Sequence, residues 1–87
     1  MNELNEYTKQ GITLRKYVFE RIGELLFAER RKHEQRLDII SRQTNITQKF
    51  IDKAECGVGK SRWTIIALLL KHYKKELTIT LTDIKKE

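Results

Sequence analysis

The sequence contains no proline, a single cysteine and no long hydrophobic run. Because Cys56 has no second cysteine to pair with, an internal disulfide is excluded, and we expect a reducing, cytoplasmic setting and no cysteine-based metal cluster. The longest uninterrupted apolar run, residues 65–70, is far shorter than the roughly 18 residues of a membrane span. With no repeat or low-complexity tract either, nothing divides the 87 residues into several domains.

Small size limits what the chain can bury. A domain of 87 residues buries only about 60–65% of the surface of its unfolded chain. Without a disulfide or a metal, its stability is therefore marginal unless a partner subunit contributes.

Positive charge is concentrated in one segment of the chain. The net charge is +6, and residues 30–62 hold nine Lys or Arg against four acids, which accounts for +5 of it. Such a concentration is typical of proteins that bind a polyanion. The alternative is an ordinary solvated surface without a binding role.

The spacing of apolar residues predicts a first helix over 14–33. Thr13 is a suitable N-cap for it, and the basic run at 30–32 suits its C-terminal turn, where cations meet the negative end of the helix dipole. The polar residues 1–12 are expected to form a flexible lead-in.

Three further helices are predicted, which makes the expected fold all-α. Two short helical patterns lie within 36–57 on either side of a turn at Asn45, and Gly57 ends the second of them. A fourth helix is predicted over 61–75. The resulting four-helix domain spans 13–76.

The alternation of apolar residues and threonines over 77–82 predicts a single strand. A solitary strand leaves its backbone groups unpaired, and the same strand from a second copy is the simplest partner, antiparallel about a twofold axis. The fourth helix is apolar on every side, so it also calls for a partner; the alternative is that the strand folds back within its own chain. We therefore expect a homodimer joined through the C-terminal segment 77–87. The expected interface residues are Leu70, Tyr73, Leu77, Ile79 and Leu81.

Residues 36–57 meet the requirements of a helix-turn-helix unit. Counted from Leu37, the fifth residue must be small, the ninth must accept an unusual backbone angle, and the fourth, tenth and fifteenth should be apolar. The small fifth residue is Ser41 and the ninth is Asn45. The apolar fourth, tenth and fifteenth residues are Ile40, Ile46 and Ile51.

The second short helix, 47–56, would then enter the major groove of DNA with its polar side. Gln48 can hydrogen-bond adenine, Lys49 and Lys53 can donate to guanine, and Asp52 can accept from cytosine or merely repel wrong registers. Thr47 is expected to bond a phosphate while capping the helix.

Two alternatives stay open for this helix. Its polar side can be only the solvated side of a surface helix. Phe50 is expected to pack against the protein rather than contact a base.

Residues 22–57 resemble the lambda-repressor-like helix-turn-helix family of phage repressors and small bacterial regulators, through Arg30, "TNITQKFIDKAE" and the closing Glu55-Cys56-Gly57. The resemblance implies a four-helix DNA-binding domain. It also implies an ion pair between Arg30 and Glu55 that clamps the first helix to the reading helix near the DNA phosphates. Without the resemblance, the two residues are equally consistent with an exposed ion pair that contributes little to stability.

Three positions depart from the family pattern. Leu37 stands where a phosphate-binding glutamine is common, so that contact is expected to move to Arg36. Glu29 and Thr44 stand where apolar residues are usual, so the core there is expected to be looser.

The stretch "AECGVGKSRW", 54–63, matches the loose form of a nucleotide-binding phosphate loop. A phosphate loop needs a strand before it and an acidic magnesium ligand on a second strand, whereas the residues before this stretch predict a helix. The family resemblance instead implies that Lys60, Ser61 and Arg62 run along the DNA backbone. We therefore expect no nucleotide and no other cofactor or metal.

The tail "KELTITLTD" is similar to the dimerising strand of antitoxins that accompany HipA-type kinase toxins. Together these observations predict a transcriptional regulator, of repressor type, that binds a palindromic operator in double-stranded DNA as a homodimer. The alternative is an antitoxin-type module that holds a toxin protein and controls its own operon. An enzyme is not expected, because His33 and His72 are far apart in sequence and no convincing catalytic set accompanies them.

Overall fold

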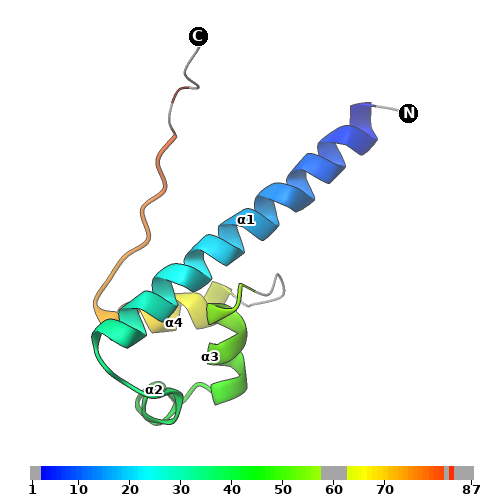
Figure 1. The fold of residues 1–87 in the computed structure, drawn as a ribbon. Coiled ribbons are helices and arrows are strands. Elements are labelled where there is room, and N and C mark those ends of the chain that lie inside the picture. Colours follow the sequence, from blue (N-terminus) through cyan, green and yellow to red (C-terminus); the bar gives the residue numbers. More distant parts are fainter. Residues whose placement is uncertain (1–2, 58–62, 82, 84–87) are drawn as a thin grey trace.

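Four helices make up the computed structural model, which describes residues 3–57, 63–81 and 83 (Figure 1). They are α1 (Glu3–Lys32), α2 (Leu37–Thr44), α3 (Gln48–Glu55) and α4 (Trp63–Tyr73). The all-helical prediction is confirmed for these residues. Within the described ranges, none of the helices has both the length and the apolar character that crossing a membrane requires.

Helix α1 begins eleven residues earlier than predicted, at Glu3 rather than after Thr13. The expected flexible lead-in over 1–12 is therefore wrong for residues 3–12. The Thr13 hydroxyl donates a hydrogen bond to the Lys9 carbonyl at 3.0 Å, so it bonds back within the helix instead of capping it. Gly11 has open space around it and nothing else interrupts the helix, whose N-terminal part projects beyond the other helices (Figure 1).

The turn between α2 and α3 is held by polar contacts at the predicted positions. Asn45 adopts the left-handed conformation, with φ 61° and ψ 25°, and donates its N–H to the Ser41 carbonyl at 2.9 Å. The Ser41 hydroxyl donates to the Ile46 carbonyl, and the Thr44 hydroxyl donates to the Ile40 carbonyl at 2.7 Å. Thr44 does not loosen the core, because its hydroxyl also accepts the Ile46 N–H at 3.3 Å.

Side chains from all four helices meet in one core. At its centre lie Ile40 of α2, Ile51 of α3 and Leu69 of α4, each almost fully buried. Each contributes roughly 1.5–3 kcal/mol through the removal of its apolar surface from water. The remaining buried hydrophobic residues are Phe19, Ile22, Leu26, Ile46, Ala54, Ile66 and Tyr73.

Helices α1 and α3 approach each other at two glycines. A Cβ atom on Gly23 would lie 2.5 Å from the Glu55 carbonyl oxygen and 2.7 Å from that of Ala54. Gly57 ends α3 with a φ of 72°, as predicted, and a Cβ there would lie 2.6 Å from the Glu20 Cα. This close approach fixes one side of α3 against α1 and leaves the opposite side exposed.

The chain after α4 has neither helix nor strand over 75–81. Lys74 ends α4 in the left-handed conformation, with φ 58°, and the Lys75 N–H donates to the Leu70 carbonyl at 2.9 Å. Leu77, Ile79 and Leu81 are exposed. The strand predicted over 77–82 needs a second copy to pair with, and within this single chain residues 77–81 are unpaired; Thr82 lies outside the described residues.

Tyr73, one of the residues predicted at the dimer interface, is buried in the core of its own chain. Leu70, expected beside it, is half-buried and packs against the same core. A helix that is apolar on every side does not reveal which side faces its own domain, so the burial of Tyr73 was not predicted. The dimer interface itself stays a prediction.

Candidate nucleic-acid interface

The exposed side of α3 carries the four predicted base-reading residues. Ile51 and Ala54 are buried against the rest of the domain, which turns the opposite side of the helix to solvent. The exposed side chains there are Gln48, Lys49, Asp52 and Lys53.

Phe50 was expected to pack against the protein, yet 44% of it is exposed on the same helix. An exposed aromatic ring beside polar residues can contact the methyl group of thymine. Sequence reasoning missed this residue because an aromatic side chain next to Ile51 reads as part of a core.

The ion pair implied between Arg30 and Glu55 is present. The Arg30 Nε donates to Glu55 Oε2 at 2.7 Å and its second terminal nitrogen donates to Glu55 Oε1 at 2.9 Å. The two side chains are only 15% and 5% exposed, and the hydrogen bond to Glu55 raises the pKa of Arg30 above its usual value. This two-point contact joins the end of α1 to the end of α3, and because it is buried, loss of either partner would leave the other charge without compensation.

Arg30 was also expected to contact a phosphate. Its other terminal nitrogen donates to the Gln35 carbonyl at 3.2 Å, in addition to the two bonds to Glu55. A guanidinium has five N–H donors, so two are left for a phosphate. Arg30 therefore acts first as a structural clamp.

An open cleft of about 860 Å³ lies beside the first turn of α3, and three arginines against two acidic residues make its lining slightly basic. It brings together Gln48 of α3, Arg30 and Arg31 of α1, and the loop between α1 and α2. Arg31 was not predicted as a site residue, because three consecutive basic residues in a sequence do not show which of them faces a cleft. The whole lining is Arg30, Arg31, Glu34, Gln35, Arg36, Leu37, Asp38 and Gln48.

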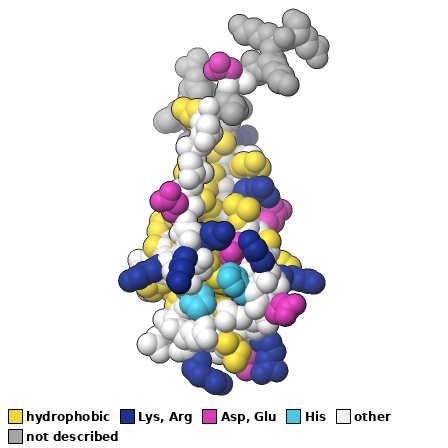
Figure 2. All heavy atoms as spheres, turned by 90° about the vertical axis from the view of Figure 1, so that its left-hand side faces the viewer, with side chains coloured by type: hydrophobic (Ala, Val, Ile, Leu, Met, Phe, Trp, Pro, Cys, Tyr) yellow, Lys and Arg dark blue, Asp and Glu magenta, His cyan; other side chains and the backbone are white. Residues whose placement is uncertain are grey.

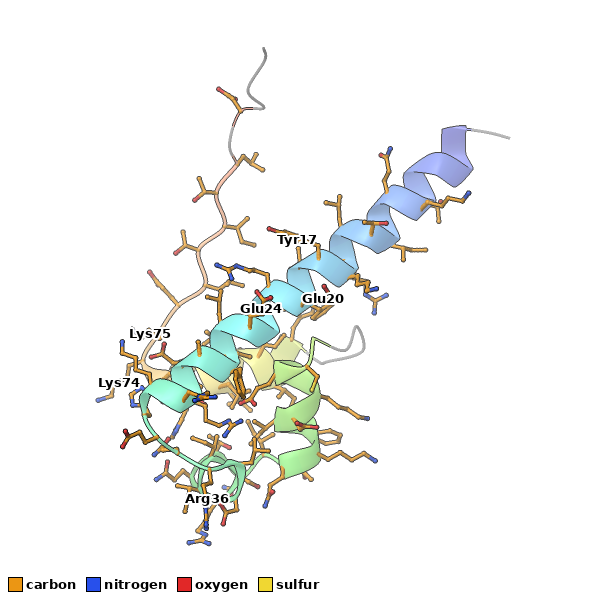
Figure 3. The ribbon with its side chains drawn as sticks, in the orientation of Figure 1. Tyr17, Glu20, Glu24, Arg36, Lys74 and Lys75 are labelled. Carbon is orange, nitrogen blue, oxygen red and sulfur yellow. The ribbon has the colours of Figure 1, made fainter. Side chains whose placement is uncertain are left out.

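Arg36, a predicted phosphate contact, extends from the start of α2 into solvent (Figure 3). Its guanidinium donates two hydrogen bonds to the Asp38 carboxylate, at 3.2 Å from Nε and 3.0 Å from a terminal nitrogen. These bonds hold the pKa of the Asp38 carboxyl below its usual value. Three of the five N–H donors of Arg36 are left for a phosphate, which would bind beside this carboxylate.

Thr47 takes the N-cap position of α3 as predicted, but its side chain makes no capping hydrogen bond. Its carbonyl accepts the N–H groups of Phe50 and Ile51, at 2.9 and 3.2 Å. The first N–H groups of a helix, left without an internal acceptor, favour an anion. The start of α3 thus adds to the positive character of the adjacent cleft.

The predicted backbone contacts Lys60, Ser61 and Arg62 lie outside the described residues. The structure does describe the chain just before them, and α3 occupies Gln48–Glu55. A phosphate loop needs a strand at that place, whereas the chain forms a helix there, as the sequence predicted.

The two histidines, far apart in sequence, meet around one tyrosine. The His33 ring stacks on the Tyr73 ring with centroids 5.6 Å apart, and the His72 ring meets its edge at 5.1 Å. Figure 2 shows both histidines on one face, among Lys and Arg side chains. Burial raises the pKa of Tyr73 to about 12, so its phenol stays protonated at neutral pH. Within the described residues, no group of three or more His, Cys, Asp or Glu side chains could hold a metal ion.

Comparisons with known proteins identified no relative of the chain. No protein-family model, no curated protein and no solved structure matches the chain. The resemblance of residues 22–57 to the lambda-repressor-like family stays a prediction, and the functional argument depends on the geometry of α3 and its surroundings.

Proposed function

We propose that the chain is a sequence-specific, double-stranded DNA-binding transcriptional regulator of repressor type, in the manner of the lambda-repressor-like family. Helix α3 enters the major groove, with Gln48, Lys49 and Lys53 reading base edges and Asp52 accepting from cytosine. The protein acts as a homodimer on a palindromic operator, whose half-sites lie about 34–36 Å apart along the duplex.

The observation that carries this proposal is the orientation of α3. Its apolar side is buried, its far end is clamped by the buried ion pair between Arg30 and Glu55, and its polar side faces solvent. A short helix that only completes a core has no need of so rigid a support. A reading helix does, because base contacts require side chains held in a fixed position against the groove.

The position of the basic cleft supports the same proposal. Arg31 and Arg36 flank the first turn of α3, where the N–H groups of Gln48 and Lys49 also favour an anion. In this arrangement phosphate contacts set the register of the protein on the duplex, while the exposed side of α3 reads the sequence.

Selection of bound duplexes from a random pool at near-physiological salt tests the proposal. We expect a symmetrical consensus, because a twofold dimer presents two copies of α3. The control is Lys9→Ala, which removes one exposed positive charge from the projecting part of α1 and should leave the consensus unchanged. Failure to enrich any sequence would contradict base reading by α3.

A further inference from the structure

An apolar strip of α1 faces solvent beside the side that packs into the core. Leu14 and Tyr17 are 62% and 64% exposed, and Leu25 is 46% exposed. The half-buried Val18 lies between them at helical spacing. We call Leu14, Tyr17, Val18 and Leu25 the outer strip of α1.

The C-terminal segment carries a second set of exposed apolar residues. Ile79 is 77% and Leu81 is 95% exposed, and Leu77 is partly exposed. These residues alternate with threonines, so in an extended chain they share one side. Within the described residues, the backbone of 76–81 makes no hydrogen bond.

An apolar pocket joins the two sets. It has a volume of about 180 Å³ and is lined by residues of α1, of α4 and of the chain that follows α4. Figure 1 shows that α1 and the C-terminal segment diverge after α4. Leu25 of the outer strip and Leu77 of the C-terminal segment both line it, together with Leu26, Leu70 and Tyr73. A pocket of this size accepts one or two branched aliphatic side chains.

We propose that a second copy of this chain covers the outer strip of α1, with its residues 77–81 lying along the strip and an apolar side chain in the pocket. The exchange is reciprocal about a twofold axis, so each copy offers both a strip and a segment. The proposal extends the predicted interface, which included no residue of α1. It rests on the homodimer of the proposed function, although it does not require DNA recognition.

A second copy fits the surface better than an unrelated protein does, because residues 77–81 of the same chain carry exposed apolar side chains that can cover the strip. The exposed parts of Leu14, Tyr17, Leu25, Leu77, Ile79 and Leu81 together amount to roughly 700 Å² of mostly apolar surface, close to the ~800 Å² that each partner buries in a standard interface.

One charged side chain interrupts the strip. Arg21 lies between Tyr17 and Leu25 and pairs with Glu24 at 3.1 Å. An arriving segment therefore meets apolar side chains on either side of a paired charge, and the long stem of Arg21 can pack beside it. The projecting part of α1 and the C-terminal segment also extend away from α2 and α3, which leaves the reading helix open (Figure 1).

The mass of the full chain, measured by sedimentation equilibrium without DNA at micromolar concentrations, tests the proposal. We expect a mass of twice 10.4 kDa for the unchanged protein. Leu14→Lys and, separately, Leu81→Lys should each weaken dimerisation at least tenfold, since each places a charge in the proposed interface. Both side chains are so exposed that neither substitution should unfold the monomer, which the helical circular dichroism signal verifies.

Ile12→Lys is the matched control. Ile12 is 65% exposed on the same helix, but helical spacing places it on the opposite side of α1 from Leu14, so this variant should stay dimeric. A monomeric unchanged protein would overturn the proposal. So would a Leu14→Lys variant that dimerises normally, or an Ile12→Lys variant that dissociates as readily. Because no DNA is present, each of these outcomes is separate from any failure of base reading.

Discussion

The helix-turn-helix region and the projecting part of the molecule treat their hydrophobic residues in opposite ways. In α2, α3 and the turn between them, Ile40, Ile46 and Ile51 are buried and the polar residues face solvent. In the outer strip of α1 and in residues 77–81, large hydrophobic side chains face solvent instead. The first region is complete as a single chain, whereas the second has the character of half an interface. The following experiments test this difference, from the largest expected effect to the smallest.

Paired substitutions of isoleucine should separate the two regions most clearly. Ile51→Ala should lower the free energy of unfolding by about 3–4 kcal/mol, because it leaves a cavity at the centre of the core. Ile79→Ala in the Leu14→Lys background, which holds the chain monomeric, should change it by less than about 0.5 kcal/mol. Urea unfolding monitored by circular dichroism measures both values. Equal losses would show that residues 77–81 are packed within their own chain.

Two glycines of α1 provide the next comparison. Gly23→Ala should destabilise the protein by about 2–3 kcal/mol, because the new methyl group meets backbone oxygens of Glu55 and Ala54 that cannot move independently of α3. Gly11→Ala, with open space around it, should instead stabilise α1 by about 0.5–1 kcal/mol. Thermal unfolding of the two variants should therefore shift in opposite directions. A stable Gly23→Ala protein would mean that α1 and α3 are not in tight contact.

Substitutions on α3 test whether its exposed polar side reads DNA. Gln48→Ala should cost about 1–3 kcal/mol of binding free energy and relax the preference at one base pair. Lys9→Ala, on the projecting part of α1, should leave both quantities unchanged. Binding to the selected consensus and to its single-base variants measures the effect. An unaltered sequence preference in Gln48→Ala would remove this residue from the base readers.

Tyr73 lies at the border between the two regions, since it belongs to the core and lines the apolar pocket. Burial, together with the nearby carboxylates of Glu55 and Glu29, raises its pKa from 10.0 to about 12. Because folding raises this pKa, the protonated phenol of Tyr73 contributes fully to the free energy of unfolding below about pH 10. That contribution is lost as the pH rises from about 10 to 12.

Tyr73→Phe isolates that contribution. In the folded chain the phenol oxygen is buried and has no hydrogen-bond partner among the described residues, so the variant should be close to neutral in stability at pH 7. Above pH 10 it should lose less stability than the unchanged protein. Urea unfolding at a series of pH values measures the difference, and parallel losses in the two proteins would exclude Tyr73 as its source.

The helix-turn-helix region could be predicted from the sequence because its rules are local. Asn45 and Gly57 take the left-handed conformations that their residue types favour, and Ser41 is small where the helices cross. The spacing of the buried isoleucines then sets which side of α3 is exposed. The basic residues of the cleft were only partly predictable. No sequence pattern distinguishes Arg31 from the basic residues on either side of it, and its place in the cleft depends on where α1 ends.

The ends of the chain were less predictable, for two physical reasons. Threonine is a common N-cap residue, but the Thr13 hydroxyl can also donate a hydrogen bond to a carbonyl one turn earlier in a helix. Only the structure shows that it does the latter. Tyr73 is one of several apolar residues that surround α4, so its burial depends on where α1 packs. For Tyr73 the decisive contact comes from another segment of the chain, whereas for Thr13 it comes from the preceding turn of the same helix.

The pairing of Arg36 with Asp38 has a consequence for how binding responds to ionic strength. In the proposed complex, a phosphate at Arg36 binds a guanidinium whose charge the Asp38 carboxylate already offsets. The affinity of a cationic side chain for DNA usually weakens with added salt because it displaces condensed cations from the duplex. At Arg36 the paired Asp38 anion lies close to the same backbone and retains some of those cations, so this contact adds less to the salt dependence than an unpaired arginine would.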